Sequence, residues 1–373
     1  MAAMAKPLNE LGLTAAMGRN PQITGLAVDS REIKEGFLFA ALPGTRVHGG
    51  EFIQYALRMG AAAILTDVQG AQIAEAELAG SNAALIIAED PRQTLAYTAA
   101  LWFGEQPGIV AAVTGTNGKT SVSTFLRMIW QELGFEAINL GTTGVEGDFQ
   151  APLQHTTPEP ITLHRTLAAA CQAGVEFAAM EASSHGLEQR RLDGVQLTAA
   201  GFTNFTQDHL DYHETFEDYF AAKAGLFARV LPEEGTAVIN IDDERGVDIA
   251  AIAKARGQHI ITVGRSGADL NLDAQRFDAT GQDIRFTFRG QSFMARLNLI
   301  GGFQSENVLL AAGLAIACGA DPERTFEVLH ELKTVRGRMQ DAATRKNGAT
   351  VFVDYAHTPD AVQTALQAMR PHV

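Results

Sequence analysis

Cysteine is scarce in this chain of 373 residues, which contains only Cys171 and Cys318. A disulfide framework requires more cysteines at regular spacings, so the sequence argues against a small secreted domain held together by disulfide bonds. Both cysteines lie in alanine-rich helical patterns. We therefore expect two buried core thiols with no catalytic role.

Basic residues and long apolar runs are also lacking. The chain has 29 Lys and Arg against 43 Asp and Glu, a formal net charge of −14, which disfavours nucleic acid or an anionic membrane as the main partner. No apolar run approaches the ~18 residues of a membrane-spanning helix, and residues 1–13 do not have the pattern of a signal peptide. We therefore expect a cytoplasmic protein with neither a nucleic-acid nor a membrane partner.

Short apolar runs alternate with helical patterns along most of the chain. A first α/β unit of ~90 residues, with apolar runs at 61–66 and 83–88, precedes a longer series. This alternation predicts an α/β fold with a parallel sheet, helices on both faces and a ligand site beyond the carboxyl ends of the strands. Residues 284–299 instead indicate an antiparallel pair with a turn at Arg289-Gly290. The later strands are expected at 109–113, 137–140, 176–180, 199–203, 237–240 and 259–263.

A glycine-spaced loop follows the strand expected at 109–113. Its sequence is Thr114-Gly115-Thr116-Asn117-Gly118-Lys119-Thr120-Ser121, and an amphipathic helix is expected at 122–133. Backbone N–H groups, a helix N-terminus and one lysine together form a phosphate cradle, so the segment predicts nucleoside triphosphate binding. The common G-x-x-x-x-G-K-[ST] spacing requires a glycine at position 113, where this chain has a valine.

Several polar residues could complete a site for a metal-bound triphosphate. Thr120 follows the loop lysine and Glu181 follows the strand expected at 176–180, so both could bind Mg²⁺. Residues 208–213 contain two histidines and two aspartates. We prefer a magnesium ligand there, His209, to a structural zinc site, because strand alternation does not place all four side chains on one face. The pattern alone favours a surface position for Lys223.

These segments occur in the order seen in the Mur ligase family, which the chain resembles over essentially its whole length. Within the family it looks like the MurE type, which adds the third amino acid to the peptidoglycan precursor UDP-N-acetylmuramoyl-L-alanyl-D-glutamate. The shortened loop is usual in this family. The MurF type shares Asp-Ser-Arg near its start but not Ser-Ser-His-Gly-Leu, and a nucleotide-binding module without catalysis is a third reading. The matching segments are 114–121, 181–186, 208–213, Lys223, 337–339 and 354–359.

The resemblance implies a cytoplasmic, monomeric, ATP- and Mg²⁺-dependent amide-bond ligase that works through an acyl phosphate. It implies a small N-terminal α/β domain that binds uridine (1–103), a central P-loop ATPase domain with a parallel sheet (104–334) and the start of a Rossmann-like C-terminal domain (335–373). That third domain would be cut short, so we expect a fragment with little or no ligase activity. The amino-acid co-substrate, meso-diaminopimelate or L-lysine, stays open, since the selecting residues would lie beyond position 373.

The same resemblance assigns roles to individual residues. Lys119 and Lys223 would be catalytic, and Lys223 would be carboxylated by carbon dioxide and join His209 at a second magnesium, with Thr120 and Glu181 at the first. The loop 45–47 departs from the family in residue type, and position 155 is commonly asparagine. The ATP-binding residues would be Gly115, Thr116, Asn117, Gly118, Lys119, Thr120, Ser121, Asn307, Arg338 and Asp354. The precursor-binding residues would be Val28, Ser30, Thr45, Arg46, Val47, His155, Thr156, Thr157, Ser183, Gln189 and Arg191.

Overall fold

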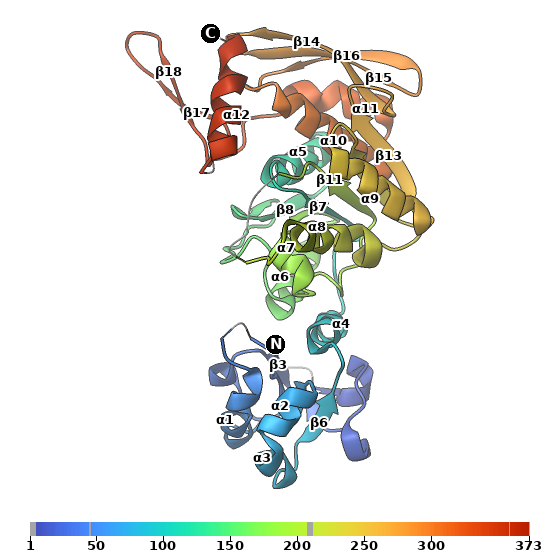
Figure 1. Cartoon of the computed structure of the whole chain (residues 1–373), viewed down its shortest axis with the longest axis vertical. Helices are drawn as coiled ribbons and strands as arrows, with labels where there is room; N and C mark the ends of the chain where they lie inside the picture. The colour runs from blue at the N-terminus through green and yellow to red at the C-terminus, as the bar shows by residue number, and fades with distance from the viewer. Residues whose placement is uncertain (1–4, 45, 207–211, 358, 373) are drawn as a thin grey trace. The chain divides into compact units, whose positions relative to one another are not determined.

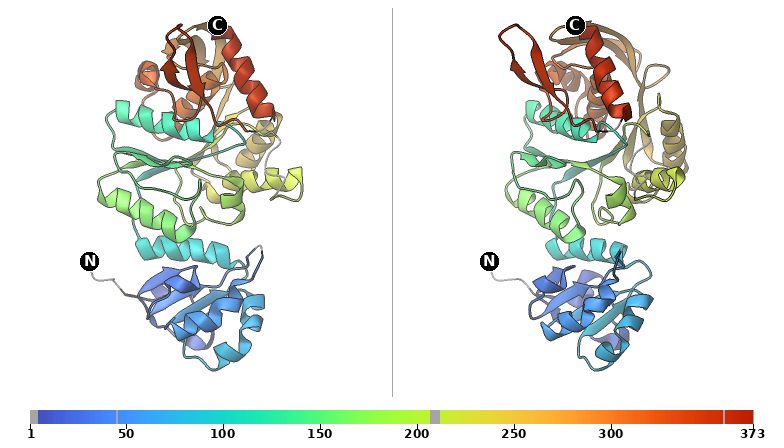
Figure 2. Two further views of the ribbon diagram at one scale, coloured as in Figure 1. Left: turned by 90° about the vertical axis from the view of Figure 1, so that its left-hand side faces the viewer. Right: turned by 60° about the vertical axis from the view of Figure 1, so that its left-hand side comes forward.

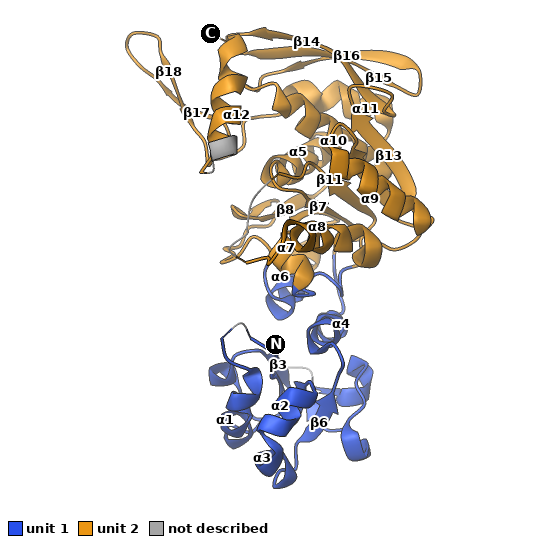
Figure 3. Cartoon of the chain, in the orientation of Figure 1, with its two compact units in different colours: residues 1–106, 158–169, 189–195 blue, residues 107–157, 170–188, 196–373 orange. Residues whose placement is uncertain are grey.

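The computed structural model describes residues 5–44, 46–206, 212–357 and 359–372, and these form two compact units (Figures 1 and 3). Unit 1 contains residues 1–106 together with 158–169 and 189–195. Unit 2 contains 107–157, 170–188 and 196–373. The chain therefore passes between the units more than once, and the second unit holds most of its length.

Unit 1 is built on a four-stranded parallel sheet in the order β3-β4-β5-β6. Successive strand residues face opposite sides of a sheet, and here Leu38 and Leu65 pack in one apolar cluster while Phe39 and Ile64 pack in another. The sheet is thus buried on both faces. Its strands are β3 (Gly25–Ala27), β4 (Phe37–Ala40), β5 (Ala63–Thr66) and β6 (Ala84–Ile87), and its helices are α1 (Ile53–Arg58), α2 (Val68–Ile73), α3 (Glu75–Ala79) and α4 (Pro91–Phe103). A short pair, β1 (Lys6–Pro7) and β2 (Gln22–Ile23), precedes them.

Unit 2 contains a ten-stranded sheet within the described residues, in the order β16-β15-β14-β13-β12-β11-β7-β10-β8-β9. The pairs between β8 and β14 are parallel, whereas β9, β15 and β16 pair antiparallel. The strands are β7 (Ile109–Thr114), β8 (Ala137–Gly141), β9 (Gly144–Gly147), β10 (Phe177–Glu181), β11 (Ala199–Phe202), β12 (Thr236–Asn240), β13 (His259–Gly264), β14 (Leu270–Asp278), β15 (Gly281–Phe288) and β16 (Gln291–Leu297).

Two long helices cover the centre of this sheet. These are α5 (Lys119–Glu132) and α10 (Phe303–Ala317). Both contribute to a large apolar cluster, α5 through Val122, Phe125 and Ile129 and α10 through Val308 and Leu309. The helices of unit 2 are α5 (Lys119–Glu132), α7 (Ser184–Glu188), α8 (Phe216–Gly225), α9 (Glu244–Ala255), α10 (Phe303–Ala317), α11 (Pro322–Glu327) and α12 (Pro359–Met369), while α6 (Pro160–Gln172) contributes to both units.

A hairpin and α12 form the C-terminal end of unit 2, beside the antiparallel part of the sheet (Figure 2). The hairpin pairs β17 (Gln340–Thr344) with β18 (Thr350–Val353). The His372 ring fastens this end to the unit, since its Nε2 accepts the N–H of Gly301 at 3.0 Å and its Nδ1 lies 2.7 Å from the carbonyl oxygen of Asp278.

The predicted α/β fold class with a parallel sheet is confirmed, and each strand expected from an apolar run is present within a residue or two. In the ten-stranded sheet, β9 and β14 were not predicted, and outside it β1 and β17 were not predicted either. The prediction of two buried thiols is wrong for Cys171, which is half-buried, and correct for Cys318. The predicted division at residues 103 and 334 stays a prediction. In the part of the chain that the structure describes, no helix is both long and apolar enough to cross a bilayer.

Candidate functional site

The glycine-spaced loop lies at the carboxyl end of β7, in the middle of the sheet of unit 2. Gly115 has φ +142° and Gly118, which precedes α5, has φ +86°. A Cβ atom on Gly115 would lie 1.8 Å from Thr203 Oγ1, and one on Gly118 would lie 2.6 Å from Asn307 Oδ1. Because both positions combine positive φ with no room for a side chain, the loop requires glycine at each.

Polar groups after β11 hold the backbone of this loop in place. Thr203 Oγ1 donates to the carbonyl oxygen of Asn117 at 2.6 Å, and Asn204 Oδ1 accepts the Asn117 N–H at 2.9 Å. The Thr116 N–H donates to the Asn204 carbonyl oxygen at 2.8 Å. These hydrogen bonds hold the loop in one shape, and the first turn of α5 leaves N–H groups without an intrahelical acceptor, as an anion site requires.

Two lysines meet at the first glycine of the loop. Lys119 Nζ donates to the carbonyl oxygens of Gly115 and Thr116, at 2.9 and 2.7 Å. Lys223 Nζ, from α8, donates to the same Gly115 oxygen at 2.8 Å. Lys223 is only 1% exposed, so the surface position that the pattern favoured is wrong. The buried ammonium group is paired with the carbonyl oxygen of Gly115, and the sequence around Lys223 does not indicate this partner.

Glu181 and Thr120 form a buried pair of oxygens beside the loop. Glu181 is the last residue of β10, which pairs with β7. Its Oε2 accepts from Thr120 Oγ1 at 3.0 Å, and its Oε1 accepts the Thr142 N–H at 2.8 Å. Adjacent ligands of an octahedral Mg²⁺, each at about 2.1 Å, lie about 3 Å apart. The residues present therefore fit the first magnesium site that the resemblance implies.

The second implied metal site would combine Lys223 with His209. His209 lies outside the described residues, together with the rest of 207–211. Among the described residues, no group of three or more His, Cys, Asp and Glu side chains is arranged to hold a metal.

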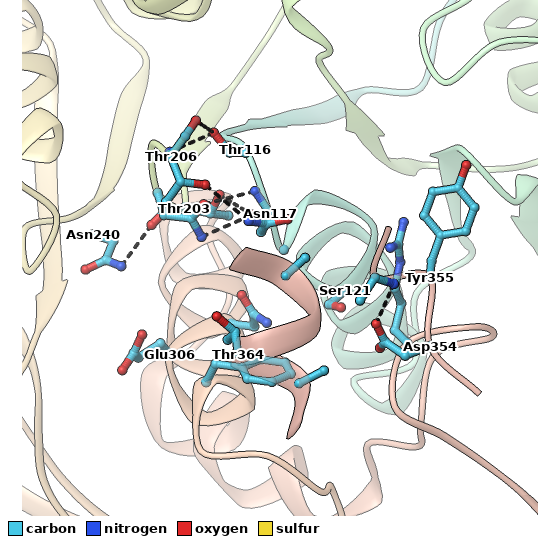
Figure 4. Close-up of a pocket in the computed structure, with 18 of the residues that line it drawn as sticks. Thr116, Asn117, Ser121, Thr203, Thr206, Asn240, Glu306, Asp354, Tyr355 and Thr364 are labelled. Atoms are coloured by element: carbon cyan, nitrogen blue, oxygen red, sulfur yellow. Dashed lines mark hydrogen bonds between the residues drawn. The ribbon is translucent and has the colours of Figure 1, made fainter. Parts of the chain in front are cut away.

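A pocket of about 250 Å³ lies beside the phosphate loop in unit 2 (Figure 4). Asn307 lines it and is the fifth residue of α10. Arg338 Nη2 donates to Thr120 Oγ1 at 3.2 Å, which links this side of the pocket to the loop. Asp354 accepts the N–H groups of Met339 and Ala356, at 2.7 and 2.8 Å, and so holds the turn that carries Arg338. All three residues predicted to bind ATP from this side therefore line one pocket.

Sequence reasoning missed several residues of this pocket. Thr203 and Asn204 follow β11, so the rule about strand carboxyl ends that identified Glu181 could also have identified them. Tyr355 and Thr364 come from the C-terminal segment, and Figure 4 shows their side chains with those of Thr116 and Asn117 around the same space. Nothing in the local sequence distinguishes Thr364 from other residues of its helix.

The predicted precursor-binding residues of unit 2 gather around Glu181. Thr157 Oγ1 donates to the Glu181 carbonyl oxygen at 2.9 Å and accepts the Ser183 N–H at 3.0 Å. The hydroxyl of Thr156 lies 3.1 Å from that of Thr142, a residue that also binds the Glu181 carboxylate. His155, next to Thr156, is exposed.

The remaining predicted precursor-binding residues lie in unit 1. Ser30 is buried after Asp29, and a hydrogen bond from Arg31 holds the pKa of the Asp29 carboxyl below its usual value. Arg191 Nη2 donates to Gln189 Oε1 at 2.8 Å, so these two side chains are in contact. The side chains of Val28, Arg46 and Val47 are exposed, and Thr45 lies outside the described residues.

Comparisons with known proteins agree with this arrangement. Residues 22–103 match the family model "Mur ligase family, catalytic domain", and residues 113–315 match "Mur ligase middle domain". One relative is a UDP-N-acetylmuramoyl-L-alanyl-D-glutamate–2,6-diaminopimelate ligase of Caulobacter vibrioides. The two sequences are 44% identical over an alignment that covers 99% of this chain and 76% of the length of the relative.

Solved structures show the same likeness. The structure of a ligase with the same name, 30% identical, has a TM-score of 0.83 over 99% of this chain and 75% of its own. MurF of Thermotoga maritima, in complex with ADP, has a TM-score of 0.61 at 21% identity, over 93% of this chain and 74% of its own, and shows the fold alone. The resemblance found in the sequence is thereby confirmed. This chain belongs to the Mur ligase family of ATP-dependent ligases.

Proposed function

We propose that this protein joins 2,6-diaminopimelate to UDP-N-acetylmuramoyl-L-alanyl-D-glutamate with the consumption of ATP, a step of peptidoglycan synthesis. The observation that carries the proposal is the 44% identity, over nearly the whole chain, to a relative named for this reaction. The phosphate loop, the Thr120–Glu181 pair and the nearby pocket supply the groups that such chemistry needs.

The chemistry has two steps. An oxygen of the precursor carboxylate attacks the γ-phosphorus of ATP and ADP leaves, which gives an acyl phosphate. The amine then attacks the acyl carbon, phosphate leaves and the amine loses a proton. Positioning and charge neutralisation account for most of the catalysis in phosphoryl transfer. The loop N–H groups would orient the phosphates, while Lys119 would leave the carbonyls of Gly115 and Thr116 and neutralise the γ-phosphate.

Two metal ions would assist by neutralising phosphate charge. Thr120 and Glu181 would hold one Mg²⁺, and a carboxylated Lys223 with His209 would hold the other. In this structure Lys223 Nζ donates a hydrogen bond to Gly115 O, whereas a carboxylated lysine carries a negative charge and two acceptor oxygens. Carboxylation would therefore change the partners of this side chain. Mass spectrometry of the intact, native protein under carbon dioxide tests it, and a mass that never rises by one CO₂ would contradict it.

Binding and turnover experiments test the proposed function. Isothermal titration should show that the protein binds the muramoyl-dipeptide precursor and Mg²⁺-ADP. Phosphate release that requires both the precursor and diaminopimelate would support the proposed reaction, and would overturn the expectation of a fragment with little or no ligase activity. Preference for the muramoyl-tripeptide would favour a MurF-type ligase instead. Nucleotide binding without precursor binding would favour a nucleotide-binding module.

Two variants that each remove one negative charge make the test specific. In Glu181→Gln the side chain keeps its shape but loses the negative charge, so Mg²⁺-ADP affinity should fall about tenfold or more. Glu136→Gln removes the same charge from an exposed position and should leave the affinity unchanged. Equal affinities for the two variants would contradict a metal role for Glu181.

A further inference from the structure

Tyr219 connects the phosphate loop to Lys223. It lies on α8 one turn before Lys223, is fully buried, and its ring centroid is 4.4 Å from Lys223 Nζ. Its hydroxyl lies 3.2 Å from Thr116 Oγ1 of the phosphate loop. Phe205 and His213 pack against the ring, with centroid distances of 5.0 and 5.2 Å. This packing fixes the direction in which the hydroxyl points.

The hydrogen-bonding capacity of Thr116 determines the direction of this contact. A threonine hydroxyl donates once and accepts twice. Thr116 Oγ1 donates to the Thr206 carbonyl oxygen at 3.1 Å and accepts the Thr206 N–H at 3.0 Å. One acceptor position is then left for Tyr219, so the phenol O–H is the donor. Figure 4 shows the neighbouring bonds between Thr116 and Thr206.

We propose that Tyr219 is a positioning residue that holds Thr116, and with it the phosphate loop, in the shape that binds nucleotide. No role of this kind follows from the motifs of the chain, because Tyr219 lies far from the loop in sequence. The inference rests on the proposed function, since it requires that the loop bind a nucleotide. Thr116 also accepts from Lys119 at its carbonyl oxygen, so a shift of Thr116 would move an acceptor of the loop lysine as well.

Two hydroxyl deletions test the proposal with little change of shape. Tyr219→Phe keeps the buried ring and Thr116→Val keeps the volume of the loop residue. Loss of one neutral hydrogen bond should weaken Mg²⁺-ADP binding about two- to tenfold for Tyr219→Phe. If the two hydroxyls act through the same bond, the double variant should bind much more tightly than the product of the two single losses predicts. Tyr97→Phe, on the exposed face of α4, is the matched control and should bind as the wild type does.

Isothermal titration with Mg²⁺-ADP and, separately, with the muramoyl-dipeptide precursor distinguishes the outcomes. The proposal expects a selective loss of ADP affinity in Tyr219→Phe and a non-additive double variant. It is overturned if Tyr219→Phe binds ADP as the wild type does, if the two losses multiply, or if both ligands lose affinity equally. Failure of the wild type to bind ADP overturns the proposed function, and this inference with it.

Discussion

Two glycines, one on each side of α5, allow the effect of a substitution on folding stability to be distinguished from its effect on nucleotide binding. Gly118 immediately precedes the helix with φ +86°, and Gly134 follows it with φ +91°. A Cβ atom on Gly134 would meet nothing within 4 Å, whereas one on Gly118 would lie 2.6 Å from Asn307 Oδ1 and 3.5 Å from Thr203 Cγ2. An alanine at either position therefore pays a similar backbone cost, but only one of the two disturbs the pocket.

The expected magnitudes follow from these geometries. An L-residue in the left-handed region costs about 1–2 kcal/mol relative to glycine, so both variants should lower the free energy of unfolding by about that amount. Gly118→Ala must also displace the Asn307 amide, which is bonded to Gln304 at 3.2 Å. That displacement adds about 1 kcal/mol. Since Asn307 lines the pocket, we expect Mg²⁺-ADP affinity to fall at least about tenfold, or about 1.4 kcal/mol.

Urea unfolding and isothermal titration of both variants provide the test. We expect Gly134→Ala to lose stability but retain ADP affinity, and Gly118→Ala to lose both. Equal ADP affinities for the two variants would refute the argument, because the clash at Asn307 would then have no effect on the site. A Gly118→Ala variant as stable as the wild type would show that the left-handed conformation is not required.

Three further predictions concern single side chains. Burial lowers the pKa of His164 from 6.5 to about 4, so the folded protein holds it neutral. As pH falls from 6.5 to 4 the unfolded state therefore binds more protons than the folded state, and the free energy of unfolding should decrease by up to about 3 kcal/mol. Urea unfolding at several pH values should show this decrease in the wild type and not in His164→Gln. Thr203→Val removes the donor to Asn117 O and should weaken ADP binding about tenfold in titrations. Lys223→Met removes the amine that now donates to Gly115 O and that, once carboxylated, would hold the second Mg²⁺. It should abolish any phosphate release that depends on both substrates, while thermal melting still shows a cooperative transition.

The parts of the fold that could be predicted from the sequence are those with a local cause. Apolar runs of four to six residues predicted the parallel strands because such strands are buried on both faces. The strand β14 was missed because only its first part is buried, at Leu270 and Leu272, and Asp273 and the residues after it are largely exposed. The strand β9 was missed because it is four residues long and begins and ends with glycine.

The candidate site could be predicted where residues follow strands, and not where distant segments meet. Glu181 ends a strand next to β7, so its place near the loop follows from the topology. The burial of Lys223 depends on an acceptor 108 residues earlier in the chain, Gly115 O. The resemblance to the Mur ligases was therefore needed to select Lys223, since its own helix carries no pattern that distinguishes a buried cation from an exposed one.

The valine at position 113 has a structural reason. The strand β7 continues through Val113 to Thr114, where Val113 pairs with Glu181 on one side and Gly201 on the other. A glycine at 113 would weaken a central strand, because it has no side chain to pack and loses more backbone entropy. The turn begins one residue later, at Gly115, whose φ and close contact with Thr203 exclude any other residue. The loop thus takes its first glycine at Gly115, after the strand has ended. The same pairing of β7 with β10 that places Val113 opposite Glu181 brings the Glu181 carboxylate to the loop.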